Sequence, residues 1–179
     1  RHTSFRAGGA ARLYVVLADP EKIIQLVELA TNQSVPWTVY GGGSNLLVAD
    51  EGYEGLVIQM SGRNVTISGT HVQAESGLIS GLLARKTVDA GLTGFEWAIG
   101  LPGTIGGAIY GNAGCYGGEM KDFLVSVDAY EVATKTRVRL SREECGFGYR
   151  ESRFKKEHFI LFGCELELLV SPDAAKGKA

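Results

Sequence analysis

Glycine is concentrated in two short windows, and these windows constrain the fold more than any other feature of the sequence. Three consecutive glycines occupy positions 41–43, and eight more lie from Gly100 to Gly118, out of 25 in the 179-residue chain. Apolar segments flank both windows, which argues against a flexible linker. Glycine at this density lets the backbone come close to another chain segment or to a ligand.

The first window, Tyr40–Val48, follows an apolar strand pattern at Trp37–Tyr40. Its glycines allow successive backbone N–H groups to converge on an anion. No Lys-Ser/Thr pair follows, as a P-loop requires, and no helix pattern starts at the third glycine, as a Rossmann fingerprint requires. A glycine-rich hairpin or bulge is the alternative. The predicted anion-binding residues are Tyr40, Gly41, Gly42, Gly43, Ser44, Asn45 and Leu46.

The second window, from Gly100 to Gly118, contains few ionisable residues. Pro102-Gly103 favours a turn, and Gly106-Gly107 allows a flat or anionic ligand to approach the backbone. This composition suits an apolar ring system held by backbone donors, whereas a tight loop packed against the rest of the protein is the alternative. The predicted cofactor contacts are Gly100, Pro102, Gly103, Thr104, Gly106, Gly107, Asn112 and Gly114.

Local patterns divide the chain into two lobes at about residue 60. Residues 1–60 alternate strand and helix signals, which is typical of a small α/β unit. Asp19 followed by Pro20 predicts a helix start, because aspartate caps free N–H groups and proline fits the first turn. The predicted strands of this lobe are Leu13–Leu17, Trp37–Tyr40 and Gly55–Met60.

Residues 61–170 carry mainly antiparallel strand signals. Ser76 and Gly91 fit the two ends of a helix over Leu78–Ala90, and the capping-box spacing of Ser141–Glu144 predicts a short helix. The predicted strands are Asn64–Ser68, His71–Glu75, Val125–Val132, Arg137–Leu140 and Phe159–Leu169. We therefore expect an α+β fold with a small α/β lobe, a larger lobe built on an antiparallel sheet, and a polar tail at 171–179.

Charge and cysteine content narrow the class of protein. The net charge of −2 gives no general basis for binding nucleic acid or a membrane surface. No apolar run approaches the roughly 20 residues of a membrane span. The three cysteines and three histidines are isolated from one another, so they suggest neither a disulfide framework nor a metal site. A reducing cytoplasm is the expected compartment.

Both windows together resemble the FAD-binding domain of the vanillyl-alcohol-oxidase type. Four motifs, in order along the chain, narrow the resemblance to the UDP-N-acetylenolpyruvoylglucosamine reductase family. The motifs are His2–Gly9 (HTSFRAGG), Gly41–Leu47 (GGGSNLL), the second window from Gly100 to Gly118, and Phe147–Phe154 (FGYRESRF). The match runs from residue 1 to about residue 170.

The resemblance implies a function. The family uses FAD, takes hydride from NADPH and converts UDP-N-acetylglucosamine enolpyruvate to UDP-N-acetylmuramate for peptidoglycan synthesis in the bacterial cytoplasm. It implies that Arg150 is catalytic and that Tyr149 and Arg150 bind the UDP-sugar substrate. The family also needs a serine or cysteine proton donor and a glutamate, both from a C-terminal domain that no segment here matches. We therefore expect this chain to bind FAD and to be inactive alone.

Three other interpretations remain at this stage. One is a different flavin oxidase or dehydrogenase of the same fold, and another is a flavin-binding module without chemistry of its own. A nucleotide-binding domain without flavin is disfavoured by the missing P-loop and Rossmann features. Arg150 could instead form a surface ion pair, for example with Glu151, and the basic residues 150–156 could be a solvated edge.

Overall fold

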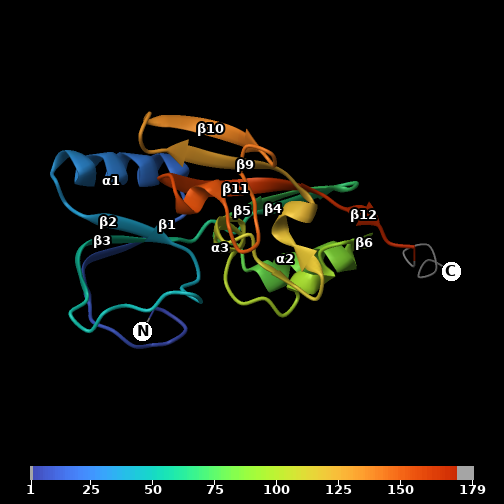
Figure 1. Cartoon of the computed structure of the whole chain (residues 1–179), viewed down its shortest axis with the longest axis horizontal. Coiled ribbons are helices and arrows are strands. Elements are labelled where there is room, and N and C mark those ends of the chain that lie inside the picture. The colour runs from blue at the N-terminus through green and yellow to red at the C-terminus, as the bar shows by residue number, and fades with distance from the viewer. Residues whose placement is uncertain (1, 173–179) are drawn as a thin grey trace.

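The computed structural model describes residues 2–172, which fold around two β-sheets (Figure 1). The smaller sheet has the strand order β1-β3-β2 and is parallel throughout. Its strands are β1 (Ala11–Leu17), β2 (Trp37–Tyr40) and β3 (Tyr53–Met60). Because parallel strands point the same way, the first glycine window leaves the sheet from the edge where all three strands have their carboxyl ends.

Helix α1 (Pro20–Asn32) covers one face of this sheet. It begins where the sequence predicts, because Asp19 Oδ1 accepts a hydrogen bond from the backbone N–H of Glu21 at 2.9 Å and Pro20 occupies the first turn. Ile23, Val27 and Ala30 recur at helical spacing and are buried.

The larger sheet has five antiparallel strands in the order β10-β9-β11-β5-β4. One of its faces packs on helices α2 (Ser80–Asp89) and α3 (Ile105–Tyr110) through a continuous apolar core. The five strands are β4 (Val65–Ser68), β5 (His71–Glu75), β9 (Leu124–Glu131), β10 (Thr136–Ser141) and β11 (Phe159–Glu167). Short elements connect them: β6 (Leu92–Thr93), β7 (Gly114–Cys115), β8 (Gly118–Glu119), β12 (Leu169–Val170) and the 3₁₀ turns Glu96–Ala98, Met120–Asp122 and Arg153–Lys155.

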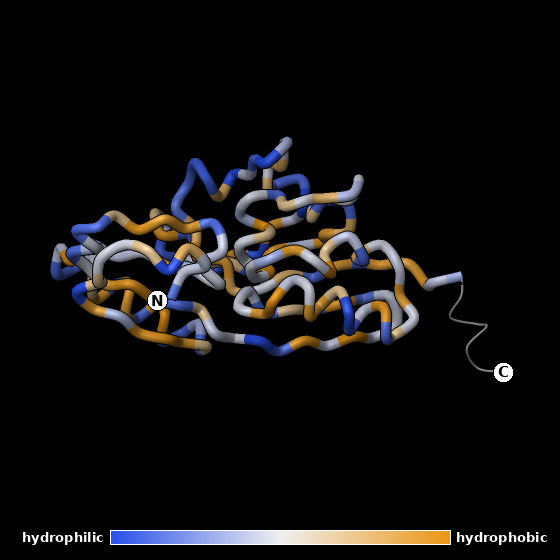
Figure 2. The backbone as a smooth tube through the Cα atoms, turned by 90° about the horizontal axis from the view of Figure 1, so that it is seen from below, coloured by the Kyte–Doolittle hydropathy of each residue, from blue (hydrophilic) through white to orange (hydrophobic). Residues whose placement is uncertain are grey.

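Helix α1 also packs on the opposite face of the larger sheet, so it lies between the two sheets. Tyr130, Ile160 and Phe162 from the larger sheet join Ile23 and Val27 of the helix in a second apolar core. Apolar stretches accordingly run through both halves of the molecule (Figure 2). Tyr130 is buried, and its hydroxyl donates a 2.6 Å hydrogen bond to the Glu28 carboxylate.

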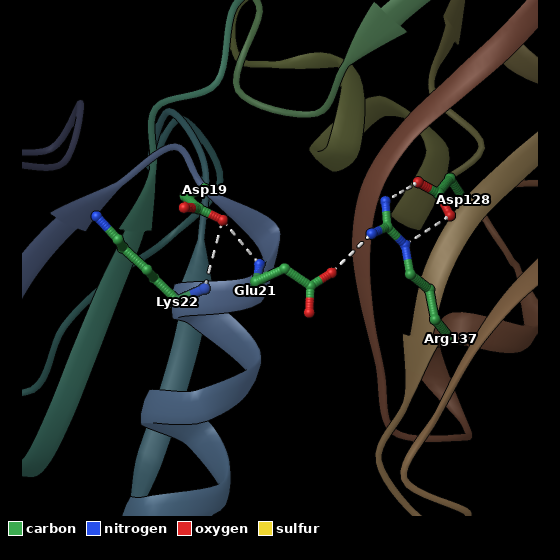
Figure 3. A network of polar contacts seen from close by, with 5 residues as sticks. All are labelled: Asp19, Glu21, Lys22, Asp128 and Arg137. Carbon is green, nitrogen blue, oxygen red and sulfur yellow. Dashed lines mark hydrogen bonds and ion pairs between the residues drawn. The ribbon is translucent and has the colours of Figure 1, made fainter.

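At the surface, an arginine also links helix α1 to the larger sheet. Arg137 on β10 pairs with Asp128 on the neighbouring strand at 2.7 Å and with Glu21 on the first turn of α1 at 2.9 Å (Figure 3). All three side chains are well exposed, so such pairs contribute at most about 1 kcal/mol each. The apolar core beneath them therefore carries most of the stability of this contact.

Most of the predicted elements are present within a few residues, but two local predictions are wrong and one helix was not predicted. Helix α2 is capped at Ile79 without a side-chain hydrogen bond, so Ser76 is not its cap. The Ser141–Glu144 capping-box bonds form, yet the segment is a turn, because the chain reverses at Gly146 with φ 57°. The second glycine window contains a helix, α3, which was not predicted from the sequence.

Two further expectations concern the ends of the chain and the membrane. Residues 173–179 of the predicted polar tail lie outside the described residues. Within the described part of the chain, no helix combines the length and the hydropathy that a membrane crossing requires.

The buried hydrogen bond between Tyr130 and Glu28 gives a first prediction. Tyr130→Phe removes this bond and should lower the free energy of unfolding by about 1 kcal/mol, measured by urea denaturation at neutral pH. Burial first, and then Glu28, raises the pKa of Tyr130 from 10.0 to about 12. The raised pKa therefore stabilises the fold below pH 10, and this contribution is lost as the pH rises through 12. Tyr53→Phe on β3 is the matched control, and an equal loss in both variants would contradict the prediction.

Candidate functional site

The two glycine windows meet in space, although about 60 residues separate them in the sequence. A Cβ atom on Gly41 would lie 2.1 Å from Thr104 Oγ1, and one on Gly42 would lie 3.2 Å from Gly103 Cα. Real Cβ atoms do not approach other atoms as closely as 2.1 Å. Glycine is therefore required at position 41 for the windows to touch. We call residues 41–44 and 103–104 the glycine junction.

Gly103 is required for two reasons. Its φ of 101° is a conformation that residues with a side chain rarely adopt. An added Cβ would also lie 2.5 Å from Ser44 Oγ. The predicted Pro102-Gly103 turn is thus present, and it faces the first window directly.

Backbone hydrogen bonds hold the second window against the segment that joins β5 to α2. Ser80 N–H donates to the Gly103 carbonyl at 3.0 Å, and Gly106 N–H donates to the Ser76 carbonyl at 2.9 Å. An Ile79–Thr104 bridge lies between them. The junction is consequently built from three separate parts of the chain.

Three buried hydroxyl groups around the junction have no hydrogen-bond partner among the described residues: Ser76 Oγ, Ser80 Oγ and Thr104 Oγ1. Their residues are at most 5% exposed. Leaving a buried polar group unpaired costs about 1–3 kcal/mol, and buried hydroxyls in native proteins nearly always have partners. The arrangement therefore suits a polar ligand that would supply the missing hydrogen bonds.

Three other predicted residues of the first window, Tyr40, Asn45 and Leu46, lie outside the glycine junction. Asn45 and Leu46 are exposed. The Tyr40 hydroxyl approaches the His2 carbonyl at 3.5 Å, and burial followed by the Tyr14 hydroxyl raises its pKa. Gln59 donates a 3.1 Å hydrogen bond to the Gly41 carbonyl, which fixes the start of the loop.

Four further predicted residues, Asn112, Gly114, Tyr149 and Arg150, gather at a second place. Gly148 and Glu151 exchange two backbone hydrogen bonds, of 3.0 and 3.2 Å, and leave Tyr149 and Arg150 at the tip of a tight turn. We call residues 148–151 the arginine turn. It lies beside Asn112 and Gly114 of the second glycine window, and together they line a hollow of about 260 Å³.

Arg150 is available to a ligand in this hollow. One guanidinium N–H group, on Nη2, donates to the Gly114 carbonyl at 2.7 Å, and the guanidinium carbon lies 5.9 Å from the Tyr149 ring centroid. Tyr149 is 82% exposed. A guanidinium has five N–H donors in a planar fork, so the others can bind a carboxylate or phosphate bidentately.

The alternative interpretation of Arg150 as part of a surface ion pair finds no support. Among the described residues, no carboxylate lies within ion-pair distance of Arg150, and Glu151 pairs with Lys155 at 3.8 Å. Arg153 pairs with Glu157 at 2.8 Å. Arg153 and Lys155 of this segment are therefore paired with acidic neighbours, whereas, within the described part of the chain, Arg150 is not.

A larger groove, of about 460 Å³, lies on the same face of the five-stranded sheet as α1, beside the start of that helix. It includes Ser76 but no residue of the glycine junction. Its charged residues have partners within the groove: Arg137 pairs with Asp128, Arg139 pairs with Glu165, and Glu75 accepts a hydrogen bond from the Asn64 amide. Because these groups satisfy one another, the chemistry is better supported at the junction and the arginine turn. No cluster of three potential metal ligands occurs among the described residues.

Three residues of the candidate site were not identified from the sequence. Ser76 and Ser80 carry two of the unpaired hydroxyls. The sequence suggests Ser76 as a helix cap and places Ser80 inside the predicted helix, so neither is identified as a ligand contact. Glu119 accepts a 2.8 Å hydrogen bond from the Asn112 side chain. Its only sequence signal is its place directly after the second glycine window.

Comparison with protein families gives one match. A family model described as an FAD binding domain matches residues 11–141 of this chain. The matched range contains the whole glycine junction and ends shortly before the arginine turn.

Two similar proteins carry the same name. The UDP-N-acetylenolpyruvoylglucosamine reductase of Clostridioides difficile (strain 630) is 39% identical over 170 residues, which are 94% of this chain and 56% of that protein. That of Alkaliphilus oremlandii (strain OhILAs) is 41% identical over 93% of this chain and 55% of that protein. The chain thus spans little more than half the length of these relatives, and the resemblance of its motifs is confirmed.

Solved structures agree on the fold. The crystal structure of UDP-N-acetylenolpyruvylglucosamine reductase from Thermus caldophilus superimposes with a TM-score of 0.77 and 32% identity, over 90% of this chain and 57% of that chain. An alkyldihydroxyacetonephosphate synthase superimposes with a TM-score of 0.62 at 18% identity, over 88% of this chain and 31% of that chain, which is a likeness of fold alone. The expected two-lobe fold of the vanillyl-alcohol-oxidase type is confirmed.

The contact at the glycine junction gives the second prediction. Gly41→Ala forces a methyl group into Thr104 and should lower the free energy of unfolding by about 1–3 kcal/mol, as overpacking does. Gly100→Ala in the second window is the control, because an added Cβ there meets no atom within 4 Å. Thermal unfolding of the two variants measures the difference, and equal melting temperatures would show that the windows do not touch.

Proposed function

The chain belongs to the family of FAD-binding domains, and from this premise we propose that it is the flavin-holding part of an NADPH-dependent UDP-N-acetylenolpyruvoylglucosamine reductase. The single observation that carries the proposal is the meeting of both glycine windows around unpaired, buried hydroxyls. The similarity to reductases of that name over 94% of the chain supports the substrate.

The glycine junction fits FAD in its chemistry. The pyrophosphate of FAD needs several hydrogen-bond donors, and a glycine backbone with nearby hydroxyls supplies them without side-chain clashes. Thr104 Oγ1 is buried at the contact between the windows and lacks a partner. The residues that would hold FAD are Tyr40, Gly41, Gly42, Gly43, Ser44, Asn45, Leu46, Gly100, Pro102, Gly103, Thr104, Gly106, Gly107 and Gly114. The sequence also suggests Asn112 as a cofactor contact, but this residue is only 1% exposed and its amide is bonded to Glu119, Gly148 and Lys121, so we assign it to the arginine turn.

The arginine turn would act on the substrate. When bound, FAD supplies the chemistry of taking hydride from NADPH and delivering it to the enolpyruvyl double bond. Reduction of that bond leaves negative charge on the substrate carbon beside its carboxylate. Arg150 would bind this carboxylate and stabilise the charge, since preorganised cations act most strongly where charge develops. Tyr149 would line the same hollow.

We propose the same organisation for the whole protein. Residues 1–60 form the first lobe, with the pyrophosphate loop, and residues 61–170 form the second lobe. Residues 171–179 lead to a further domain that would supply the proton donor and the glutamate. With this division, the chain would bind FAD but would not turn over substrate alone. The whole protein would act in the cytoplasm on peptidoglycan precursors.

Flavin uptake tests the cofactor, and it is the third prediction. The purified chain, incubated with excess FAD and desalted, should keep the visible absorption of bound flavin at a ratio near one per chain. Gly41→Ala should keep much less. Gly111→Ala, whose added Cβ would meet only Gly107 O at the ordinary distance of 3.7 Å, should match the parent chain. A folded protein that retains no FAD in any form would contradict the proposal.

The role of Arg150 gives the fourth prediction. In the full-length protein, Arg150→Ala should leave FAD retention and flavin reduction by NADPH unchanged. It should slow reoxidation of the flavin by UDP-N-acetylglucosamine enolpyruvate by about 10²-fold or more in stopped-flow absorbance, because charge stabilisation in the transition state is lost. Loss of FAD from the variant would show that Arg150 holds the cofactor instead. Rapid reoxidation by oxygen would favour an oxidase of the same fold.

A further inference from the structure

The conformation of the arginine turn is one that its sequence does not favour. Arg150 has a φ of 55°, in the left-handed region where glycine or asparagine is usual. A residue held there is strained, and such conformations persist only where surrounding contacts enforce them. The residues that enforce this conformation therefore decide where the guanidinium points.

We propose that Asn112 is a positioning residue that holds the arginine turn, and with it the Arg150 guanidinium, in its working place. The proposal rests on the function proposed above, because it assigns a role relative to the reaction of Arg150. Asn112 lies 36 residues before Gly148 in the chain, and its side-chain Nδ2 donates a 2.8 Å hydrogen bond to the Gly148 carbonyl.

The Asn112 amide is fully used and cannot rotate without loss. Its Nδ2 donates to Glu119 Oε2 at 2.8 Å as well as to Gly148, and its Oδ1 accepts from Lys121 N–H at 3.1 Å. Turning the amide over would place its oxygen against a carboxylate and a carbonyl. Since Asn112 is only 1% exposed, water cannot replace these partners easily.

Glu119 stays ionised and therefore keeps accepting from Asn112. Its carboxylate pairs with Lys121 at 2.8 Å, and this pair first, then the Asn112 amide, lowers the pKa of Glu119. A hydrogen bond from an amide N–H to an ionised carboxylate is stronger than one between two neutral groups. The orientation of Asn112 is thus fixed from the side opposite to the turn.

Two further bonds attach the turn and the residue after it to the same stretch of chain. Ser152 Oγ donates to the Tyr110 carbonyl at 2.7 Å, and Arg150 Nη2 donates to the Gly114 carbonyl at 2.7 Å. Tyr110, Asn112 and Gly114 alternate along the end of the second glycine window. Residues 110–114 therefore hold Gly148, Arg150 and Ser152, while Lys155 Nζ donates to the Arg150 carbonyl from the other side of the turn.

Helix α3 connects this segment to the glycine junction. The helix starts directly after Thr104 and ends at Tyr110, and its six residues are about 9 Å long. A short, rigid connection of this kind fixes the distance between the place proposed for the pyrophosphate and the place of Arg150. A cofactor bound at one end would therefore meet an arginine whose position is already set.

The test uses the full-length protein with FAD bound, and it is the fifth prediction. Asn112→Ala removes the bond to Gly148 and should slow substrate-dependent flavin reoxidation by about tenfold or more, because misplaced catalytic groups lose much of their effect. FAD retention and flavin reduction by NADPH should not change. Asn64→Ala is the matched control, since Asn64 also donates to a glutamate, Glu75, at 3.0 Å but lies away from the turn.

A double variant separates positioning from a general structural effect. Asn112→Ala should add little to Arg150→Ala, because a residue that acts only through Arg150 has no effect once Arg150 is gone. Asn112→Asp preserves size and can still accept from Lys121 but cannot donate to Gly148. It should slow the same step by a similar factor.

The possible failures can be told apart. If Arg150→Ala slows the reaction and Asn112→Ala does not, the positioning role is wrong and the proposed function stands. If the two effects multiply, or if both Asn112 variants lose FAD, Asn112 supports the fold and does not act through Arg150. If Arg150→Ala itself leaves reoxidation unchanged, the function proposed for Arg150 fails, and the positioning role fails with it.

Discussion

Helix α1 packs on both sides, and this packing fixes the two sheets relative to each other. Ile23 and Val27 share one apolar core with strands of the small parallel sheet and with Tyr130, Ile160 and Phe162 of the antiparallel sheet. The carboxyl edge of the small sheet is thereby directed at the larger lobe. The first glycine window leaves from that edge, so it meets the second window only because this core places it there.

Several unfavourable local features lie where the function is proposed. Among the described residues, three buried hydroxyls without partners surround the glycine junction, and Arg150, like five other residues with a side chain, has a left-handed backbone conformation. Elsewhere, exposed charges such as Arg137 and Arg153 are paired with acidic neighbours. Native proteins tolerate unpaired polar groups and backbone strain mainly at functional sites, where a ligand or a mechanism compensates for their cost.

The two parts of the candidate site do different work and are linked by one helix. The glycine junction offers backbone donors and hydroxyls without charge, which suits a cofactor that is to be held. The arginine turn offers a cation with unused donors beside an open hollow, which suits a substrate that must enter and leave. Helix α3 joins them within a single window of sequence, so a shift in one part changes the geometry of the other.

The sequence by itself determined most of the elements and both glycine windows, because periodicity, capping at Asp19 and the requirement for glycine are local properties. It did not determine that Ser76 would be an unpaired hydroxyl, that Ser141–Glu144 would form a turn, or that residues 105–110 would be helical. Nor could it show Asn112 bound to Gly148 and Glu119. Tertiary structure decided these points, because hydrogen bonds between distant residues depend on how the sheets and helices pack, and no local pattern encodes that packing.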